Sequence, residues 1–153
     1  MTSQRLFFAL WPDDEVRDAL LRWQTENLPA RARWQHRDDL HMTLHFLGEV
    51  DSRLVPALTT LGDNCAGPSF SLNLDTTGFW RRARVLWAGP TLSSEPLMAL
   101  HGQLQNGLRA IGLRTEDRPY QPHVTLARGL GAEPTMLPLP PLDWSVREMV
   151  LVE

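Results

Sequence analysis

The order of elements that the sequence predicts occurs twice along the chain. Short apolar strands are expected from Arg5 to Leu10 and from Arg84 to Ala88, and a pattern of helical spacing follows each one. Each helical segment leads to a second strand, from Leu40 to Gly48 and from Pro122 to Arg128, in which polar and apolar residues alternate. A chain with this plan is constrained to fold as two similar strand–helix–strand modules.

The spacing within the two modules is also similar. From Leu6 to His41 is 35 positions (41 minus 6), and from Val85 to His123 is 38 positions (123 minus 85). Each histidine therefore lies near the start of the second strand of its module. We interpret the sequence as an internal repeat.

The other expected elements fill the chain within and around these modules. They are helices that begin near Pro12-Asp13-Asp14 and span Ser52 to Cys65 and Glu95 to Ile111, a strand from Phe70 to Asp75, a turn near Arg81 and Arg82, an extended passage from Pro134 to Pro141, and a last strand near Val146 to Val152. Nothing marks a linker between independent domains. Residues 1–153 are therefore expected to form a single domain made of two pseudo-symmetric lobes.

The repeated strands carry matching polar residues. His41-Met42-Thr43-Leu44 and His123-Val124-Thr125-Leu126 agree at both polar positions and are apolar at the other two. Residues two apart in a strand point to one face and lie roughly 6.6 Å apart. If the modules pack about an approximate two-fold axis, each offers one imidazole and one hydroxyl to a shared groove.

This set of groups suits the cleavage of a cyclic phosphodiester. Histidine has an ordinary pKa of about 6.5, so one of His41 and His123 can be neutral while the other is protonated. One imidazole then takes a proton from water and the other gives a proton to the leaving ribose oxygen. The hydroxyls of Thr43 and Thr125 can bind the non-bridging oxygens.

The composition of the chain excludes several other kinds of catalytic and binding site. All 15 basic residues are arginine, which excludes lysine nucleophiles, Schiff bases and the P-loop lysine. A single cysteine, Cys65, excludes an internal disulfide and a multi-cysteine zinc site. The formal charge of -3 argues against a broad basic surface for nucleic acid, so any contact with RNA is expected to be local.

The motif segments resemble a known family. Leu40-His-Met-Thr-Leu-His-Phe-Leu-Gly-Glu and Arg118-Pro-Tyr-Gln-Pro-His-Val-Thr-Leu-Ala-Arg are similar to the paired signatures of the 2H phosphoesterase superfamily. The similarity is greatest to its bacterial RNA 2′,3′-cyclic phosphodiesterase branch, once called 2′-5′ RNA ligase. The opening Gln4-Arg-Leu-Phe-Phe-Ala-Leu-Trp-Pro and the strand Val85-Leu-Trp resemble that branch too, so the resemblance covers nearly the whole chain.

The resemblance implies both a fold and a reaction. The fold is α+β and bilobal, with antiparallel sheets lining a central cleft and helices on the outside. The reaction is hydrolysis of RNA 2′,3′-cyclic ends to 2′-phosphomonoesters without a metal or other cofactor. By position in the motifs, His41 corresponds to the proton donor, His123 to the proton acceptor, and Arg128 to a phosphate contact. Strict alternation, however, places Arg128 on the face opposite His123 unless the strand bends.

Three other functions use the same residues. The pair of histidines could join RNA ends reversibly through 2′-5′ linkages or hydrolyse a small cyclic nucleotide, and a chain without turnover would be an RNA-end binding module. Product analysis separates the first two, and the absence of any product identifies the third.

Several further residues have a structural or a functional interpretation. His41 and His45 would lie roughly 13 Å apart on a strand, so a shared metal is not expected and His45 is interpreted as a packing or supporting residue. Tyr120 and Trp34 are candidates for contact with a base, because each comes just before a motif strand. The side chains assigned to the core, the surface or a solvated turn are Trp23, Trp87, His36, His101, Arg81, Arg82 and Arg84.

The start of the chain gives an expectation for location. The apolar run from Leu6 to Trp11 is too short for a signal peptide or a membrane-spanning helix. We therefore expect a soluble, cytoplasmic protein without contact with membranes. We also expect a monomer whose partner is RNA or an oligonucleotide with a 2′,3′-cyclic phosphate end.

Overall fold

The structure is a computed structural model that describes every residue except 1, 28–32, 66 and 136–137. Its helices and strands, in chain order, are β1 (Ser3–Leu10), α1 (Asp14–Glu26), β2 (Arg33–Trp34), β3 (Met42–Asp51), α2 (Val55–Cys65), β4 (Phe70–Leu74), β5 (Thr76–Trp80), β6 (Val85–Gly89), α3 (Glu95–Ile111), β7 (Val124–Arg128), β8 (Leu142–Val146) and β9 (Met149–Val152). Single turns of 3-10 helix at Arg37–Asp39 and Ser52–Leu54 precede β3 and α2.

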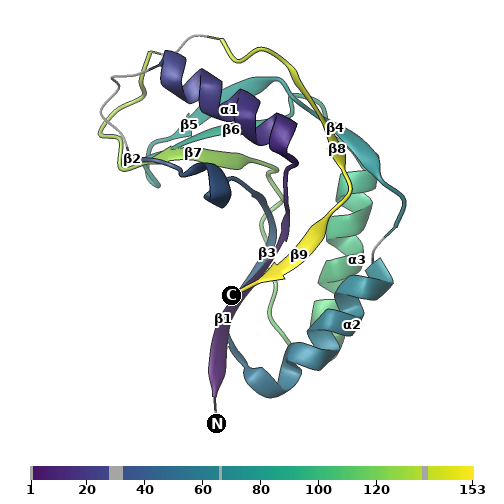
Figure 1. Cartoon of the computed structure of the whole chain (residues 1–153). Helices are drawn as coiled ribbons and strands as arrows, with labels where there is room; N and C mark the ends of the chain where they lie inside the picture. The colour runs from purple at the N-terminus through teal and green to yellow at the C-terminus, as the bar shows by residue number, and fades with distance from the viewer. Residues whose placement is uncertain (1, 28–32, 66, 136–137) are drawn as a thin grey trace.

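One large antiparallel sheet runs through both modules. Its strands follow the order β5-β6-β7-β3-β1-β9, and β2 pairs with β7 beside that path. β4 and β8 form a separate antiparallel pair. The two halves of the large sheet meet where Met42 of β3 pairs with Val124 of β7. Figure 1 shows the halves diverging from this seam, with β5, β6 and β7 on one side and β1, β3 and β9 on the other.

The two modules exchange their helices across the seam. The helix that follows β1, α1, covers the half of the sheet that contains β7, where the amide of Gln24 donates to the carbonyl oxygen of Leu126 at 3.4 Å. The helix that follows β6, α3, covers the other half, where its His101 ring stacks on His45 of β3 with centroids 4.0 Å apart. Each half of the sheet is therefore completed by the helix of the other module.

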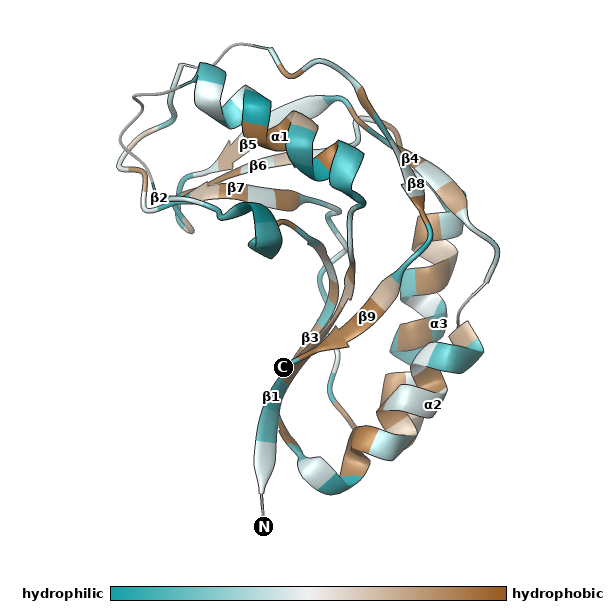
Figure 2. Cartoon of the chain, viewed as in Figure 1, coloured by the Kyte–Doolittle hydropathy of each residue, from teal (hydrophilic) through white to brown (hydrophobic). Residues whose placement is uncertain are grey.

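Local sequence signals fix the ends of these helices. Asp13 caps α1 by accepting a hydrogen bond from the backbone N–H of Val16 at 3.0 Å, and Ser94 caps α3. α3 ends at Gly112, whose φ of 99° is a left-handed conformation that glycine adopts without steric cost. Figure 2 shows hydrophilic residues on the outer surface of α1 and a largely apolar β9.

A continuous apolar core joins the helices to the sheet. Its largest fully buried side chains are Trp23, Trp144, Phe8, Leu10, Leu20, Leu40, Met42, Leu58, Leu74, Leu97, Leu104 and Leu108. These residues come from both modules and from the β4–β8 pair. Burial of this much apolar surface is the main favourable term that holds the seam together. Within the described part of the chain, no helix is long and apolar enough to cross a membrane.

The expected fold class is confirmed, with antiparallel strands and helices outside the sheet, but two details differ from the sequence prediction. The last strand is wrong as a single element, because Arg147 and Glu148 separate β8 from β9. The strand β5 was not predicted, and the turn at Arg81 and Arg82 joins it, rather than β4, to β6. The predicted passage from Pro134 to Pro141 lies partly outside the described residues, and its described part has no helix or strand.

Candidate active site

The seam of the large sheet brings the two motifs together. Met42 and Val124, which form the pair between β3 and β7, are fully buried with 0% exposure. Each follows a motif histidine directly in the sequence. Because side chains alternate along a strand, His41 and His123 point to the face of the sheet opposite the core.

The same pairing relates each histidine to the threonine of the other motif. In an antiparallel register that runs through Met42 and Val124, Thr43 comes opposite His123 and His41 comes opposite Thr125. All four of these polar side chains are partly buried. This register relates the four side chains by an approximate two-fold axis.

Both imidazoles are held in the same way by the main chain. The Nδ1 of His41 lies 2.7 Å from the carbonyl oxygen of Asp39, and the Nδ1 of His123 lies 2.8 Å from that of Gln121. A carbonyl oxygen can only accept, so each Nδ1 carries a hydrogen and donates it. Each Nε2 is then the nitrogen that can gain or lose a proton. The Nε2 of His41 lies 3.1 Å from the hydroxyl oxygen of Thr43.

Aromatic side chains surround the two imidazoles. Trp11 stacks on His41 with centroids 5.7 Å apart, and Phe7 lies against the same ring at 5.1 Å. Trp80 meets His123 edge to face at 4.5 Å. The motifs gave no sign of these neighbours, although Phe7 lies in the strand predicted at the start of the chain and Trp11 follows that strand directly. Such rings restrict the orientation of each imidazole and shield it from water.

A buried arginine supports the ring behind His41. The Arg17 guanidinium lies 4.7 Å from the centroid of Trp11 and donates to the carbonyl oxygens of Pro12 and Arg37, both at 2.8 Å. It therefore ties the end of β1 to the turn that precedes His41. Nothing in the helical pattern of this segment distinguished Arg17 from its neighbours.

A β-bulge returns Arg128 to the face that carries the histidines. In the pairing of β6 with β7, Leu86 faces Ala127 and Trp87 faces Thr125, so Leu126 has no partner. Leu126 and Ala127 are consecutive and both have 0% exposure, which reverses the alternation of side chains beyond this point. Arg128 is exposed on the same face as His123 as a result.

The first module contains an equivalent bulge. Phe8 of β1 faces His45 and Ala9 faces Thr43, which leaves Leu44 unpaired three positions after the motif histidine, as Leu126 is. His45 is therefore turned toward the core, and Phe46 takes the position that corresponds to Arg128. Phe46 is 52% exposed. The repeat thus extends to its irregularities, but only the second module provides an arginine there.

Burial and charge both act on the imidazoles. Burial lowers the pKa of His41, and the charges of Arg128 and Arg17 lower it further, whereas the bond to Asp39 opposes this. Burial also lowers the pKa of His123, and the charges of Arg128 and His41 act in the same direction, against the bond to Gln121. Arg128 therefore lies close enough to influence both histidines, and the histidines influence each other.

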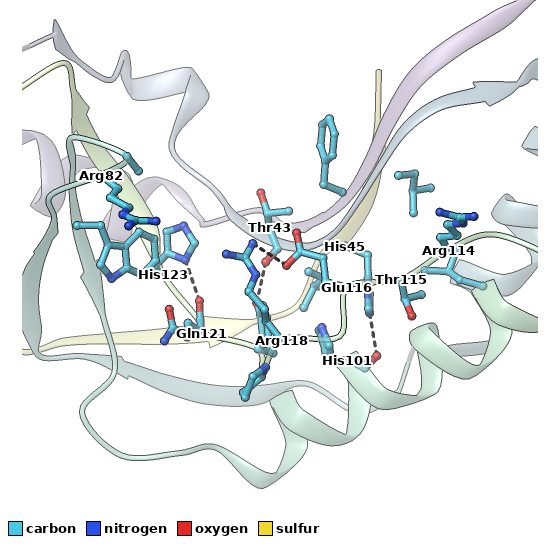
Figure 3. Close-up of a pocket in the computed structure, with 18 residues that line it drawn as sticks. Thr43, His45, Arg82, His101, Arg114, Thr115, Glu116, Arg118, Gln121 and His123 are labelled. Atoms are coloured by element: carbon cyan, nitrogen blue, oxygen red, sulfur yellow. Dashed lines mark hydrogen bonds and ion pairs between the residues drawn. The ribbon is translucent and has the colours of Figure 1, made fainter.

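A cavity of about 560 Å³ leads away from this pair. Thr43 and His123 are among the residues that line it, whereas His41 and Thr125 are not. In Figure 3, Arg82 lies beside His123 at one end of the cavity and Arg114 lies at the other. Among the described residues, no group of three His, Cys, Asp or Glu side chains could hold a metal ion.

Other side chains singled out in the sequence line the cavity, pack against other rings or lie in the interior. Tyr120 lines the cavity and stacks on His101 with centroids 4.1 Å apart, and its contact with a base stays a prediction. His45 packs in the interior, with 7% exposure. Trp34 instead packs edge to face on Trp23 at 6.4 Å. Trp87 contacts Trp80 within the sheet at 5.3 Å.

Comparison with known proteins gives the family of the chain. The family model described as the 2′-5′ RNA ligase superfamily matches residues 12–153. The chain belongs to this superfamily. Among curated members of the superfamily, the RNA 2′,3′-cyclic phosphodiesterase of Escherichia coli K12 is 37% identical over 143 residues, which cover 93% of this chain and 81% of that protein. The protein of the same name from Thermus thermophilus is 33% identical, and the match covers 97% of this chain and 80% of that one.

Solved structures that are similar to this chain have the same fold. The structure of E. coli LigT in its apo form matches with a TM-score of 0.87 and 34% identity, over 99% of this chain and 87% of that one. E. coli LigT complexed with 3′-AMP matches with a TM-score of 0.87 and 33% identity, over 98% and 87%. The phosphodiesterase domain of MHV ns2, at 16% identity and a TM-score of 0.72, shares the fold. The superfamily assignment from the motif segments is confirmed.

Proposed function

We propose that this protein hydrolyses RNA 2′,3′-cyclic phosphodiester ends to 2′-phosphomonoesters, with His41 and His123 as its catalytic acid and base. The observation that carries the proposal is the matched anchoring of both imidazoles. Each donates its Nδ1 hydrogen to a main-chain carbonyl two residues earlier, so both Nε2 atoms are available on the same face of the seam. The names of the curated relatives support the choice of substrate.

The proposed reaction requires one neutral and one protonated histidine. Neutral His123 takes a proton from water at Nε2 while the water oxygen forms a bond to phosphorus. The bond between phosphorus and O3′ breaks, and protonated His41 gives its Nε2 proton to O3′. The products are a 2′-phosphomonoester and a 3′-hydroxyl. Exchange of one proton with solvent from each histidine restores the starting states.

Other side chains would stabilise the charge on phosphorus. We assign Thr43 and Thr125 to the non-bridging oxygens as hydroxyl donors, and Arg128 to the same oxygens as a cation. The bulge at Leu126 supports this role for Arg128, because without it the guanidinium would point to the opposite face. No step of this scheme uses a metal or another cofactor, and we expect EDTA to leave the rate unchanged.

The decisive experiment uses an RNA with a defined 2′,3′-cyclic end. The wild-type protein should yield a 2′-phosphate, and His41→Ala or His123→Ala should lower kcat by about 10²–10⁴-fold with the fold retained. His36→Ala is a matched control, because His36 is exposed and lies outside the cavity. Turnover that persists in the double variant His41→Ala, His123→Ala would refute the proposal.

The same assay separates the alternatives. A 2′-5′ joined product would indicate ligation, which the same acid and base can catalyse in reverse. Turnover confined to cyclic mononucleotides would indicate a small-molecule phosphodiesterase. Binding of the RNA without any product would indicate a binding module. We also propose that the protein works as a cytoplasmic monomer, which gel filtration and cell fractionation would test.

A further inference from the structure

Four arginines converge on the end of β7, next to the candidate active site. We call Arg33, Arg82, Arg84 and Arg128 the arginine cluster. Arg33 pairs with Arg128 across β2 and β7, and Val85, which follows Arg84, pairs with Arg128 from the other side. Three separate segments of the chain therefore bring cations to the end of β7.

Two members of the arginine cluster contact Gly129. The Nη2 of Arg84 donates to the carbonyl oxygen of Gly129 at 3.0 Å, and its Nε donates to that of Leu130 at 3.0 Å. A Cβ at Gly129 would lie only 3.1 Å from the Nε of Arg33, so the guanidinium of Arg33 rests against this glycine. Gly129 itself has a φ of 75°, which a side chain would also disfavour.

The turn between β5 and β6 contains one residue with an unfavourable backbone conformation. Arg84 has a φ of 58° and is the one residue other than glycine with positive φ in the described part of the chain. Such a conformation costs on the order of 1–2 kcal/mol. The two hydrogen bonds of Arg84 to the chain after β7 offset that cost and fix the position of the hairpin, and hence of Arg82 at its tip.

The cluster has no acidic counterpart among the described residues. Each salt bridge in that part of the chain involves His36, Arg37, Arg53 or Arg118, and none includes a member of the arginine cluster. All four members are exposed. The whole chain nevertheless has a formal charge of -3, so the arginine cluster is a local exception. Cations gathered without carboxylates are expected to attract a polyanion.

The cluster is continuous with the site of chemistry. Arg128 lies close enough to lower the pKa of both histidines, and Arg82 lines the cavity together with His123 and Trp80. Figure 3 shows Arg82 beside His123. Between this end and Arg114 at the other, Arg118 is paired with Glu116 at 3.1 Å, which reduces the positive charge available there. The end beside His123 therefore gathers several cations, whereas the other end has Arg114.

We propose that the arginine cluster binds the phosphodiester backbone of the RNA strand on the 5′ side of the cyclic end, so that the enzyme favours an oligonucleotide over a cyclic mononucleotide. This inference rests on the proposed function. An RNA that ends in a cyclic phosphate can extend from the histidines only in the 5′ direction, and guanidinium groups suit contact with its phosphates. The interpretation of Arg82 and Arg84 as a solvated turn is replaced by this one.

The test compares two substrates in one variant. Arg82→Gln should lower the ratio of kcat/KM for a hexanucleotide with a cyclic end to kcat/KM for the matching cyclic mononucleotide by about tenfold, as for one lost charged hydrogen bond. The dependence of log kcat/KM on log salt should also become shallower for the hexanucleotide, by about 0.7 per lost phosphate contact.

Two control variants complete the design. Arg22→Gln should leave the ratio unchanged, because Arg22 is exposed on α1, which covers the opposite face of the sheet. Arg114→Gln removes the cation at the other end of the cavity. A fall in the ratio for Arg114→Gln but not for Arg82→Gln would overturn the proposal, as would an equal ratio in wild type and Arg82→Gln. Failure of the wild-type protein to hydrolyse either substrate would instead refute the proposed function.

Discussion

Tyr120 donates a hydrogen bond from its hydroxyl to the main-chain carbonyl oxygen of Thr43, with the two oxygens 2.7 Å apart. This bond links the loop before the second motif to the strand of the first. The Tyr120 ring also stacks on His101, which in turn stacks on His45 of β3. Tyr120 is therefore a positioning residue for both halves of the candidate active site.

The variant Tyr120→Phe should distinguish a role in positioning the motif strands from a role in binding the substrate. The variant keeps the ring but leaves the carbonyl of Thr43 without its donor, so the two motif strands can shift relative to each other. We expect kcat to fall by about 3–10-fold with little change in KM, and stability to fall by about 1 kcal/mol. Steady-state kinetics and urea unfolding measure the two effects.

Thr59→Ala provides the matched control for Tyr120→Phe. The Thr59 hydroxyl also donates to a main-chain carbonyl, that of Val55, at 2.9 Å, but on the exposed side of α2. Its loss should leave kcat unchanged. If Tyr120→Phe loses stability and keeps the wild-type kcat, the bond has only a structural role.

The sequence predicts the motif strands well because their signal is local. His41 and Thr43, and likewise His123 and Thr125, alternate with apolar residues that must be buried, so the polar face follows from the pattern alone. The strand β5 had no such signal: all five of its residues are partly buried, and neither face is distinctly apolar. Its pairing with β6 is set by tertiary packing, which no local pattern contains.

The position of Arg128 shows a second limit of the sequence. Strict alternation along β7 would place Arg128 on the face opposite His123. The bulge at Leu126 returns it to the face of His123, and this bulge is defined by the pairing of β7 with β6. A bulge depends on the partner strand, so it cannot be found from β7 alone. For the same reason the contact of Tyr120 with Thr43 and the convergence of Arg33 and Arg84 were not predicted.

The stack of His45 and His101 should make stability depend on pH. Burial, with a smaller effect of the His45 charge, lowers the pKa of His101 to about 4, and burial also lowers the pKa of His45. In the unfolded chain both regain an ordinary pKa of about 6.5, so the unfolded state binds protons more readily. Stability should be full above pH 6.5 and decrease as the pH falls to about 4.

Urea unfolding at pH 7 and at pH 4.5 tests this dependence. The loss of stability between the two values should be smaller in His101→Gln than in wild type, because one of the titrating groups is gone. His36→Gln, which changes an exposed histidine, should behave as wild type. An undiminished loss in His101→Gln would show that other groups cause the acid sensitivity.

Gly78 controls the position of the tryptophans behind His123. It pairs with Trp87 across β5 and β6, and a Cβ at Gly78 would overlap the indole ring of Trp87. Trp87 in turn contacts Trp80, whose ring meets His123. We expect Gly78→Ala to lower stability by about 1–3 kcal/mol and to reduce kcat, because the displaced rings disturb the imidazole.

Gly102→Ala is the control for that substitution. Gly102 lies within α3, and apart from its chain neighbours and the backbone of its own helix no atom lies within 4 Å of the position its Cβ would take. Alanine favours a helix over glycine by roughly 0.5–1 kcal/mol, so this variant should be slightly more stable with unchanged kcat. Equal thermal stability of the two alanine variants would contradict the proposed collision with Trp87.

Arg128 should set the pH range in which the enzyme works. Its positive charge lowers the pKa of both His41 and His123, in addition to the effect of burial. One histidine must be neutral and the other protonated, so kcat/KM should follow a bell-shaped curve with its maximum below pH 6.5. In Arg128→Gln both pKa values should rise, because the charge that opposes protonation is removed.

The curve for Arg128→Gln should therefore have both limbs at higher pH, and its maximum should be lower by about tenfold or more through loss of the phosphate contact. Arg128→Lys keeps the charge but not the planar fork of donors. Its limbs should stay near those of wild type while its maximum falls. Limbs that remain in place in Arg128→Gln, or move to lower pH, would show that Arg128 does not act on the histidines through its charge, and its role would then be limited to binding the phosphate.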